Sequence, residues 1–390
     1  MGIQSKILLS GLLGAMLSLE ALALDRGVLA SDFLYEKGSF FEASTITVDP
    51  DVTGIVTSSP KAFLINSGIP AFQPIAEILP DVGQSTGSVV NEHSRYTFSF
   101  KTDISDTLVF GYRFSEPSGN DINYADEVLG YNIDIEANAH DFLLKYKFND
   151  EISIFGGIRA QHTGSGTLGY NIAGQFNVGA DDKFGHILGF GIQNPEIKTR
   201  ILFTFTSGID HIMKGQGVEG TGIAVRGEPV SLATATKNAE LYYSTPDHIH
   251  FSLRQPISLT SAIFASYRFS NWKDSQLKSN ISGFETITKM INIEQFTVGY
   301  GRKLNDHFSL SAGFSHQTGR ASLYNPVNDR FALNIGARVS FGDLKVNLNY
   351  VHVELEDGET EISLGGLGAI GMEFKGNSAR VLSARMSYSF

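Results

Sequence analysis

Basic residues occupy alternate positions in several segments whose other positions are apolar. A strand directs successive side chains to opposite faces, so these cations share the face opposite the apolar one. Enclosed there, a guanidinium or ammonium group can bind a ligand carboxylate through charge-assisted hydrogen bonds. The candidates for this role are Arg113, Lys145, Arg159, Arg338 and Arg385. The alternative is that they pair with Asp or Glu residues of a polar interior.

Residues 62–80 contain more apolar side chains than a solvated loop would carry. The candidates for contact with an apolar ligand are Phe63, Leu64, Ile69, Phe72, Ile75, Ile78 and Leu79. Prolines divide the segment into short pieces and leave room for one or two helical turns after Pro74. Two compatible interpretations follow: the segment folds down as a plug, or it lines a groove for a hydrophobic ligand. Residues 362–374 are similarly apolar and rich in glycine.

Two histidines stand one residue apart, at His248 and His250, on a strand-like run. Their rings would share one face, which permits a metal pair, but no third histidine is near in the sequence and the chain has no cysteine. Ordinary strand histidines are therefore the favoured interpretation. No nucleophile motif or phosphate-binding loop is present. We expect no catalytic residue, no metal, no cofactor and no enzymatic activity; a lipid hydrolase is the weakest hypothesis.

Strict alternation of apolar and polar residues runs through most of the chain. It is clearest in residues 108–114, 331–341 and 382–390. A helix cannot keep these apolar residues on one face, whereas a strand does so automatically. In a barrel that spans a membrane, such strands face lipid on one side and a polar lumen on the other. The final aromatic, Phe390, with apolar residues at alternate positions before it, resembles the signal that the bacterial barrel-assembly machinery reads.

Short and long connections alternate between these strands. The short turns are expected at 104–106, 149–150, 194–196, 257–258, 305–306 and 342–343. The long connections are expected at 50–90, 118–135, 170–183, 216–238, 278–290, 321–328 and 358–377. This asymmetry is typical of outer-membrane barrels, with tight periplasmic turns and longer external loops. We predict an all-β fold, an antiparallel transmembrane barrel of about fourteen strands. A secreted sandwich or propeller is the alternative.

The first residues have the features of a secretory signal peptide. Lys6 precedes an apolar run over residues 7–19, and Ala21-Leu22-Ala23 matches a cleavage site. We divide the chain into a signal peptide (1–23), a short periplasmic or luminal segment (24–38) and one barrel domain (39–390).

Composition narrows the partners and the compartment. The 390 residues have a net charge of -11, which argues against nucleic acid as a partner. After the signal peptide no apolar run reaches the roughly 18 residues of a spanning helix. With no cysteine, the chain has neither a disulfide framework nor thiol chemistry. Forty-one glycines and 28 phenylalanines beside a single tryptophan suit an aromatic sheet protein.

Several segments, in this order and spacing, resemble one family, the FadL-type outer-membrane transporters of long-chain fatty acids and other hydrophobic compounds. They are residues 48–54, 198–215, 242–257, 261–275, 308–319, 325–341 and 346–356. The resemblance implies a fourteen-stranded barrel, an N-terminal hatch in the lumen, an external apolar groove, an internal site, and lateral exit near the third strand, here about 106–117. The hatch available, 24–38, is shorter than the family's and lacks its Asn-Pro-Ala stretch. We expect residues 50–90 to supply part of the plug. No ligand-contacting residue can be carried over from the family.

These observations favour passive transport of long-chain fatty acids or other hydrophobic molecules across the outer membrane of a Gram-negative cell. The alternative function is a general or anion-preferring porin for small polar solutes. The expected partners are a hydrophobic ligand, outer-membrane lipid and, during biogenesis, the barrel-assembly machinery. We expect a monomeric, integral barrel.

Overall fold

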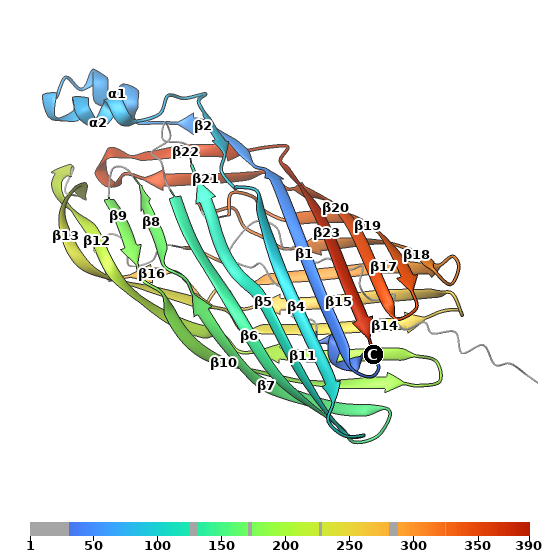
Figure 1. Cartoon of the computed structure of the whole chain (residues 1–390). Helices are drawn as coiled ribbons and strands as arrows, with labels where there is room; N and C mark the ends of the chain where they lie inside the picture. Colours follow the sequence, from blue (N-terminus) through green and yellow to red (C-terminus); the bar gives the residue numbers. More distant parts are fainter. Residues whose placement is uncertain (1–30, 125–131, 171–173, 226–227, 281–287, 324) are drawn as a thin grey trace, which may run out of the picture.

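The chain forms a closed antiparallel barrel (Figure 1). The computed structural model describes residues 31–124, 132–170, 174–225, 228–280, 288–323 and 325–390, so the predicted signal peptide lies outside the described residues. In the described part of the chain fourteen strands make the wall. They are β1 (Phe40–Asp51), β4 (His93–Asp103), β5 (Leu108–Asn123), β6 (Asn132–Lys147), β7 (Ile152–Thr163), β10 (Asp181–Asn194), β11 (Thr199–Thr206), β14 (His248–Pro256), β15 (Ser261–Ser270), β17 (Ile293–Lys303), β18 (Phe308–Gln317), β19 (Arg330–Phe341), β20 (Leu344–Leu355) and β23 (Ser378–Ser389). The predicted fold class and strand number are confirmed.

Closure is made by the first and last strands of the wall. β1 pairs with β23 from Phe40 opposite Ser389 to Asp51 opposite Ser378, and on its other edge it pairs with β4. Because β1 is paired on both edges, its backbone polar groups can be satisfied within the sheet, as a barrel in lipid requires.

Short turns gather at the end of the barrel that also holds the C-terminus (Figure 1). They are residues 104–107, 148–151, 195–198, 257–260, 304–307 and 342–343. Three begin with an asparagine whose side-chain oxygen accepts backbone N–H groups of the turn: Asn149, Asn194 and Asn305. In the last turn Gly342 takes a φ of 62°, which glycine adopts without strain. All six predicted turns are confirmed.

At the opposite end the predicted long connections contain further strands. β12 (Ile209–Val225) and β13 (Glu228–Thr245) form a long hairpin between β11 and β14, flanked by β8 (Gly166–Tyr170), β9 (Gly174–Val178) and β16 (Lys278–Ser279). A separate sheet has the order β21 (Gly358–Ser363), β22 (Ala369–Phe374), β2 (Thr53–Ser58), β3 (Ser85–Ser88). The connections 216–238 and 358–377 are thus largely paired strands, because each contains two segments that satisfy one another's backbone groups.

Two short helices lie beside this smaller sheet, α1 (Lys61–Asn66) and α2 (Gln73–Ile78), joined through the 3-10 turn η3 (Pro70–Phe72). α2 matches the helical turns expected after Pro74, and the proline occupies its first turn, where no N–H is needed. α1 was not predicted. Among the described residues, no helix is long and apolar enough to cross a membrane.

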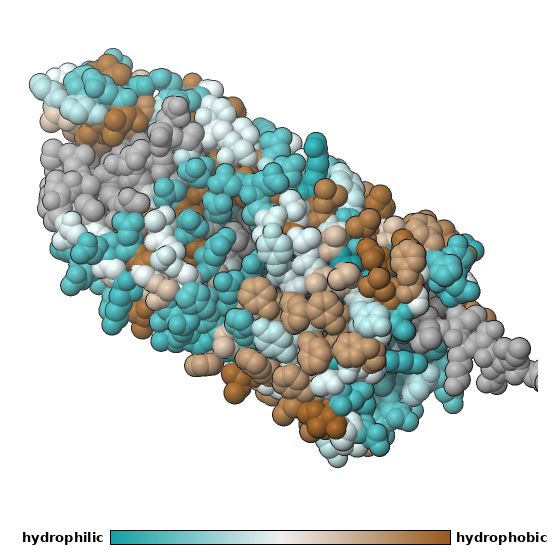
Figure 2. Space-filling model, in the orientation of Figure 1, coloured by the Kyte–Doolittle hydropathy of each residue, from teal (hydrophilic) through white to brown (hydrophobic). Residues whose placement is uncertain are grey.

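Large apolar side chains cover the outside of the wall. Leu333, Ile335 and Leu348 are each more than half exposed, at 64%, 61% and 57%. Figure 2 shows brown side chains gathered over the half of the wall nearer the C-terminus, and teal ones over the strand ends nearer the helices. An apolar belt of limited height around a closed barrel is the surface that a lipid bilayer covers.

Candidate functional site

A short N-terminal segment plugs the barrel at the end with the short turns. The 3-10 helix η2 (Asp32–Tyr35) lies inside the wall, where Phe33 and Leu34 are buried. They form an apolar cluster with wall residues of β6, β7 and β10, including Leu143 and Phe155. We call residues 31–39 the N-terminal plug. The described part of the segment expected to act as a reduced hatch, residues 31–38, thus packs in the lumen.

Luminal cations hold the N-terminal plug in place. Lys101 Nζ donates hydrogen bonds to the carbonyl oxygens of Glu36, at 2.9 Å, and Gly38. Lys145 Nζ donates to the carbonyl oxygen of Leu34 and lies 3.9 Å from the centroid of the Tyr35 ring. Both ammonium groups are buried, and the carbonyl oxygens of the plug help to satisfy their hydrogen bonds.

Two further contacts fix the plug to β11 and β7. Arg200 Nη2 lies 3.2 Å from Asp32 Oδ1, and the Tyr35 hydroxyl lies 2.9 Å from Ser153 Oγ. Lys145, one of the candidates for binding a ligand carboxylate, therefore contacts the N-terminal plug in this structure.

A buried ion triad lies on the inner face of three neighbouring wall strands, β5, β6 and β7. Arg113 donates to Asp141 Oδ2 through Nε at 3.0 Å and Nη2 at 2.7 Å, and Arg159 donates through Nε to Oδ1 at 2.7 Å and Nη2 to Oδ2 at 3.0 Å. All three side chains are at most 4% exposed. One carboxylate thus serves two guanidinium groups, which leaves a net positive charge inside the barrel.

The other two carboxylate candidates lie nearer the turns. Arg338 Nε donates to Asn347 Oδ1 at 2.5 Å, and Arg385 Nη1 lies 3.7 Å from Glu42 Oε2. All five candidates therefore have protein partners in the described part of the chain. Their role toward a ligand stays a prediction, and the structure favours the alternative for Arg113 and Arg159, pairing with an internal acid.

The apolar candidates of the first long connection divide into two sets. Leu64, Ile75 and Leu79 are at most 4% exposed and pack in the main apolar cluster of the lumen, with Phe72 against it. Phe63, Ile69 and Ile78 point outward and are 55%, 44% and 47% exposed. Both predicted interpretations therefore find a structural basis, because one face of α1 and α2 plugs the mouth and the other presents apolar side chains to the outside.

The main apolar cluster fills the end of the lumen under these helices. It joins Val52 and Val56 of the first connection to Ile370, Met372 and Phe374 of β22. Wall residues complete it, with Tyr124 and Trp272 among its largest members, each at most 1% exposed. Tyr124 donates its hydroxyl to the carbonyl oxygen of Leu323 at 3.0 Å, and burial raises its pKa. The lumen is thus apolar toward the helices and cationic toward the turns.

The wall has a gap between β4 and β5, its second and third strands. Their ladder runs from Asp103 opposite Val109 to Phe98 opposite Phe114 and stops there. The next described backbone pairing is an isolated bridge between Val90 and Ile122, beside which Asn123 N–H donates to the carbonyl oxygen of Val89 at 3.0 Å. Between these points, residues 93–97 pair with β1, and the facing part of β5 pairs with β6.

A bulge in β5 causes this gap. The register with β6 shifts between Ser115 and Ser118, where Glu116 and Pro117 oppose a single residue. A bulge bends its strand, and proline has no N–H to give to a ladder. Across the gap the backbone N–H of Tyr96 donates instead to the Glu116 carboxylate at 3.1 Å. Ile122 and Ile133, beside the gap, belong to the main apolar cluster.

Sequence reasoning expected a third strand over 106–117, and β5 spans Leu108–Asn123. It did not place the gap, although Glu116-Pro117 inside an alternating strand is the signal that could have done so.

His248 Nδ1 lies 2.9 Å from Ser270 Oγ, and the described residues contain no group of three potential metal ligands around this or any other site.

A closed barrel with an apolar outer belt, short turns at one end and a plugged lumen defines an outer-membrane type of fold. No protein-family model matches the sequence, and no curated protein matches it. Solved structures do. A Pseudomonas aeruginosa FadL homologue covers 92% of both chains at 15% identity with a TM-score of 0.73. The Pseudomonas putida toluene transporter TodX covers 91% of both at 12% identity and 0.63.

A third match is the Ralstonia pickettii toluene transporter TbuX, at 12% identity and a TM-score of 0.58, which covers 94% of this chain and 97% of its own. The fold of this chain is that of the FadL-type transporters. The predicted resemblance is confirmed at the level of fold.

Proposed function

We propose that this protein is a passive outer-membrane channel for hydrophobic small molecules, which enter beside α1 and α2 and leave sideways between β4 and β5. The gap in the wall is the observation that carries the proposal. It lies next to the apolar part of the lumen, so an apolar solute can pass from there into the bilayer without crossing the cationic part.

The entry side is supported by the outward face of the two helices. Phe63, Ile69 and Ile78 present apolar surface outside the barrel. A solute that covers them gains about 0.8 kcal/mol for each methylene removed from water. Leu64 and Ile75, directly beneath, lead to the main apolar cluster. Passage would require these packed side chains to part, a rearrangement typical of gated sites.

The route straight through the barrel is disfavoured. An apolar solute moving toward the turns would pass the charged inner face that carries Arg113, Asp141 and Arg159, and then meet the N-terminal plug. Contact with that charged surface and displacement of the plug both cost free energy without new apolar contacts in return. Lateral exit avoids both costs.

The cargo class proposed is hydrophobic compounds, with long-chain fatty acids as its finer form. Two similar solved structures, TodX and TbuX, are toluene transporters. A fatty acid would add a carboxylate, for which the net positive charge at Arg113 and Arg159 supplies attraction. Comparing uptake of radiolabelled oleate and toluene by cells that express this protein separates the two cargoes.

A disulfide across the gap tests the exit route. Thr97 and Ser115 are the first residues beyond the last paired positions of β4 and β5. The chain has no cysteine, so a T97C/S115C variant contains one thiol pair. We expect its oxidation to lower hydrophobic uptake and a reductant to restore it. The matched pair T102C/F110C, within the existing ladder, should leave uptake unchanged. Full uptake by oxidised T97C/S115C would exclude this exit.

The porin alternative draws support from the cationic lumen. It is opposed by two packed regions in the lumen, the N-terminal plug and the main apolar cluster. Single-channel recording in a planar bilayer decides: large, steady conductance would favour the porin.

A further inference from the structure

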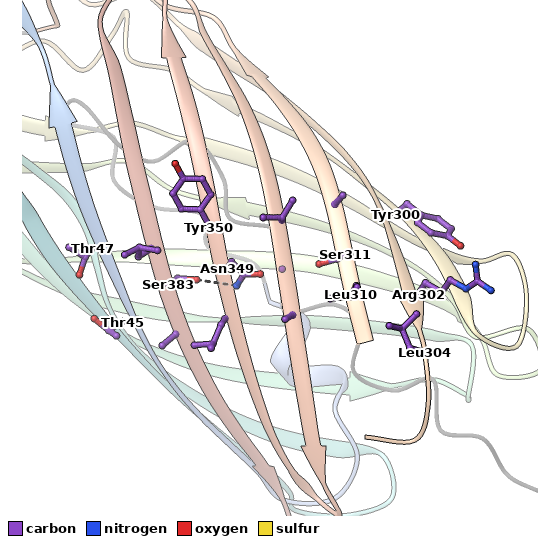
Figure 3. Close-up of a pocket in the computed structure, with 17 residues that line it drawn as sticks. Thr45, Thr47, Tyr300, Arg302, Leu304, Leu310, Ser311, Asn349, Tyr350 and Ser383 are labelled. Carbon is purple, nitrogen blue, oxygen red and sulfur yellow. Dashed lines mark hydrogen bonds between the residues drawn. The ribbon is translucent and has the colours of Figure 1, made fainter. Parts of the chain in front are cut away.

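The outer wall carries a groove opposite the lumen, across strands β17, β18, β19, β20, β23 and β1 (Figure 3). Its volume is about 870 Å³ and its surface is almost entirely apolar. This groove is separate from the luminal clusters and from the gap, since β4 stands between the gap and β1.

Small side chains make the floor of this outer groove. Ala312, Ala337 and Ala384 project outward, because each stands opposite an exposed apolar residue in the ladder. Ala337, for example, lies between Leu310 on β18 and Leu348 on β20, which are 43% and 57% exposed. Small and large residues thus alternate from strand to strand, so the alanines form the floor of the outer groove and the larger apolar side chains form its sides.

Hydroxyl and aromatic residues bound the groove at its two ends. Thr45 and Thr47 of β1 lie at one end, and Tyr300 of β17 lies at the other. The Tyr300 hydroxyl lies 2.8 Å from Ser261 Oγ, which fixes the ring against the wall. Amphipathic aromatic rings of this kind mark the level where a bilayer meets water.

A cation stands at the Tyr300 end. Arg302 is exposed and lines the groove near the end of β17, just before the short connection 304–307. Its guanidinium has no ion-pair or hydrogen-bond partner within the described residues, whereas its neighbour Lys303, on the other face, pairs with Asp306 at 2.6 Å. An apolar groove in a lipid-facing wall, with an unpaired cation at its interfacial end, matches an amphiphile with an anionic head.

We propose that this outer groove binds one membrane phospholipid from the leaflet next to the short turns, with its phosphate at Arg302 and an acyl chain over Ala312 and Ala337. Lipid tails are as apolar as the wall, so burial alone selects no occupant in a bilayer. Selection comes from the phosphate, through charge-assisted hydrogen bonds to the guanidinium, and from the shape of the small-residue floor. The inference goes beyond the proposed transport and does not depend on it.

Native mass spectrometry of the full-length protein in mild detergent tests the site, with palmitoyl-oleoyl-phosphatidylglycerol as the probe. We expect one retained lipid on the wild type. R302Q should weaken its binding about fivefold, the effect of one cation near a membrane surface. A337L should abolish retention by filling the floor. Two matched controls should bind as the wild type does: K303Q, the same charge change one residue away, and A265L, the same enlargement outside the groove.

Three outcomes would overturn the proposal. They are equal retention by R302Q, A337L and the wild type; equal binding of palmitoyl-oleoyl-glycerol, which lacks the phosphate; and a dimer of the wild type that A337L dissociates, which would make the groove an interface. Hydrocarbon uptake measured on the same variants keeps the two proposals apart. Loss of transport in every variant, wild type included, would contradict the channel and leave the lipid result standing.

Discussion

Leu34 of the N-terminal plug lies directly against Gly111 of β5, where a Cβ atom would overlap with the leucine side chain. Gly191 of β10 is in the same relation to the ring of Tyr35. Two wall strands thus use glycine to let the plug approach their backbone. The fit of the plug in the lumen therefore depends on the absence of a Cβ atom at these two positions.

The variant G111A tests this fit. Its methyl group should displace Leu34 and loosen the plug, because the rigid strand backbone cannot retreat. We expect higher conductance in planar bilayers than for the wild type, which should show little. G164A is the matched control, since a Cβ there would make ordinary contact at 3.7 Å. Unchanged conductance of a folded G111A barrel would contradict a sealing role for the plug.

Removing the shared acid should destabilise the barrel. D141N leaves Arg113 and Arg159 buried without a carboxylate, and breaking a buried pair in this way costs about 3–5 kcal/mol. Equilibrium unfolding in urea, monitored by tryptophan fluorescence of Trp272, measures the change. The control D306N removes only an exposed pair with Lys303 and should leave the unfolding midpoint unchanged. Equal stability of both variants would mean that the triad is not structural.

Adjacent residues on α1 should behave differently. F63A should raise the half-saturation concentration for hydrophobic uptake up to about tenfold, through loss of about 1.5 kcal/mol of apolar contact, without changing stability. L64A should lower the free energy of unfolding by about 2–5 kcal/mol, because Leu64 is fully buried. Uptake kinetics and unfolding measured on both variants check this. An F63A protein with wild-type uptake would remove the outward face from the entry route.

Deleting Pro117 should close the wall. One residue fewer lets β5 keep a continuous register with β6, and a straight β5 can extend its ladder with β4. We expect hydrophobic uptake to fall about tenfold, which corresponds to about 1.4 kcal/mol on the barrier.

Deletion of Thr234 is the control for the Pro117 variant, because it removes the extra residue at the register shift of the β12–β13 hairpin, away from the gap. Uptake should then remain near the wild-type value. If both deletions lower uptake equally, the effect reflects general disturbance of the barrel.

The wall was predictable from sequence because a strand has a period of two and its turns have a local chemistry. Asn149, Asn194 and Asn305 cap their turns with their own side chains, so the signal lies within a few residues. The same period placed Arg113, Lys145 and Arg159 on the inner face.

What alternation cannot supply is the register between neighbouring strands, which decides the partner of each luminal side chain. Asp141 meets Arg113 from 28 positions away, and Asn377 accepts the N–H of Thr53 from 324 positions away. Such pairs depend on the stagger of the closed sheet, which no local pattern encodes. For the same reason the small sheet of β2 and β22 was not foreseen, and neither was the plug's use of Lys101 and Lys145.

The pairing of β1 with β23 couples closure of the barrel to docking of the plug. Phe40 meets Ser389 in the closing ladder, and this is among the most distant contacts in the chain, with the slow loop closure that such separation brings. Ser39, at the end of the plug, exchanges backbone hydrogen bonds with Phe390 at 3.0 and 2.9 Å in the same seam. The backbone that closes the wall thus continues directly into the segment that seals the lumen, so a barrel with an open seam also leaves this segment without its anchor.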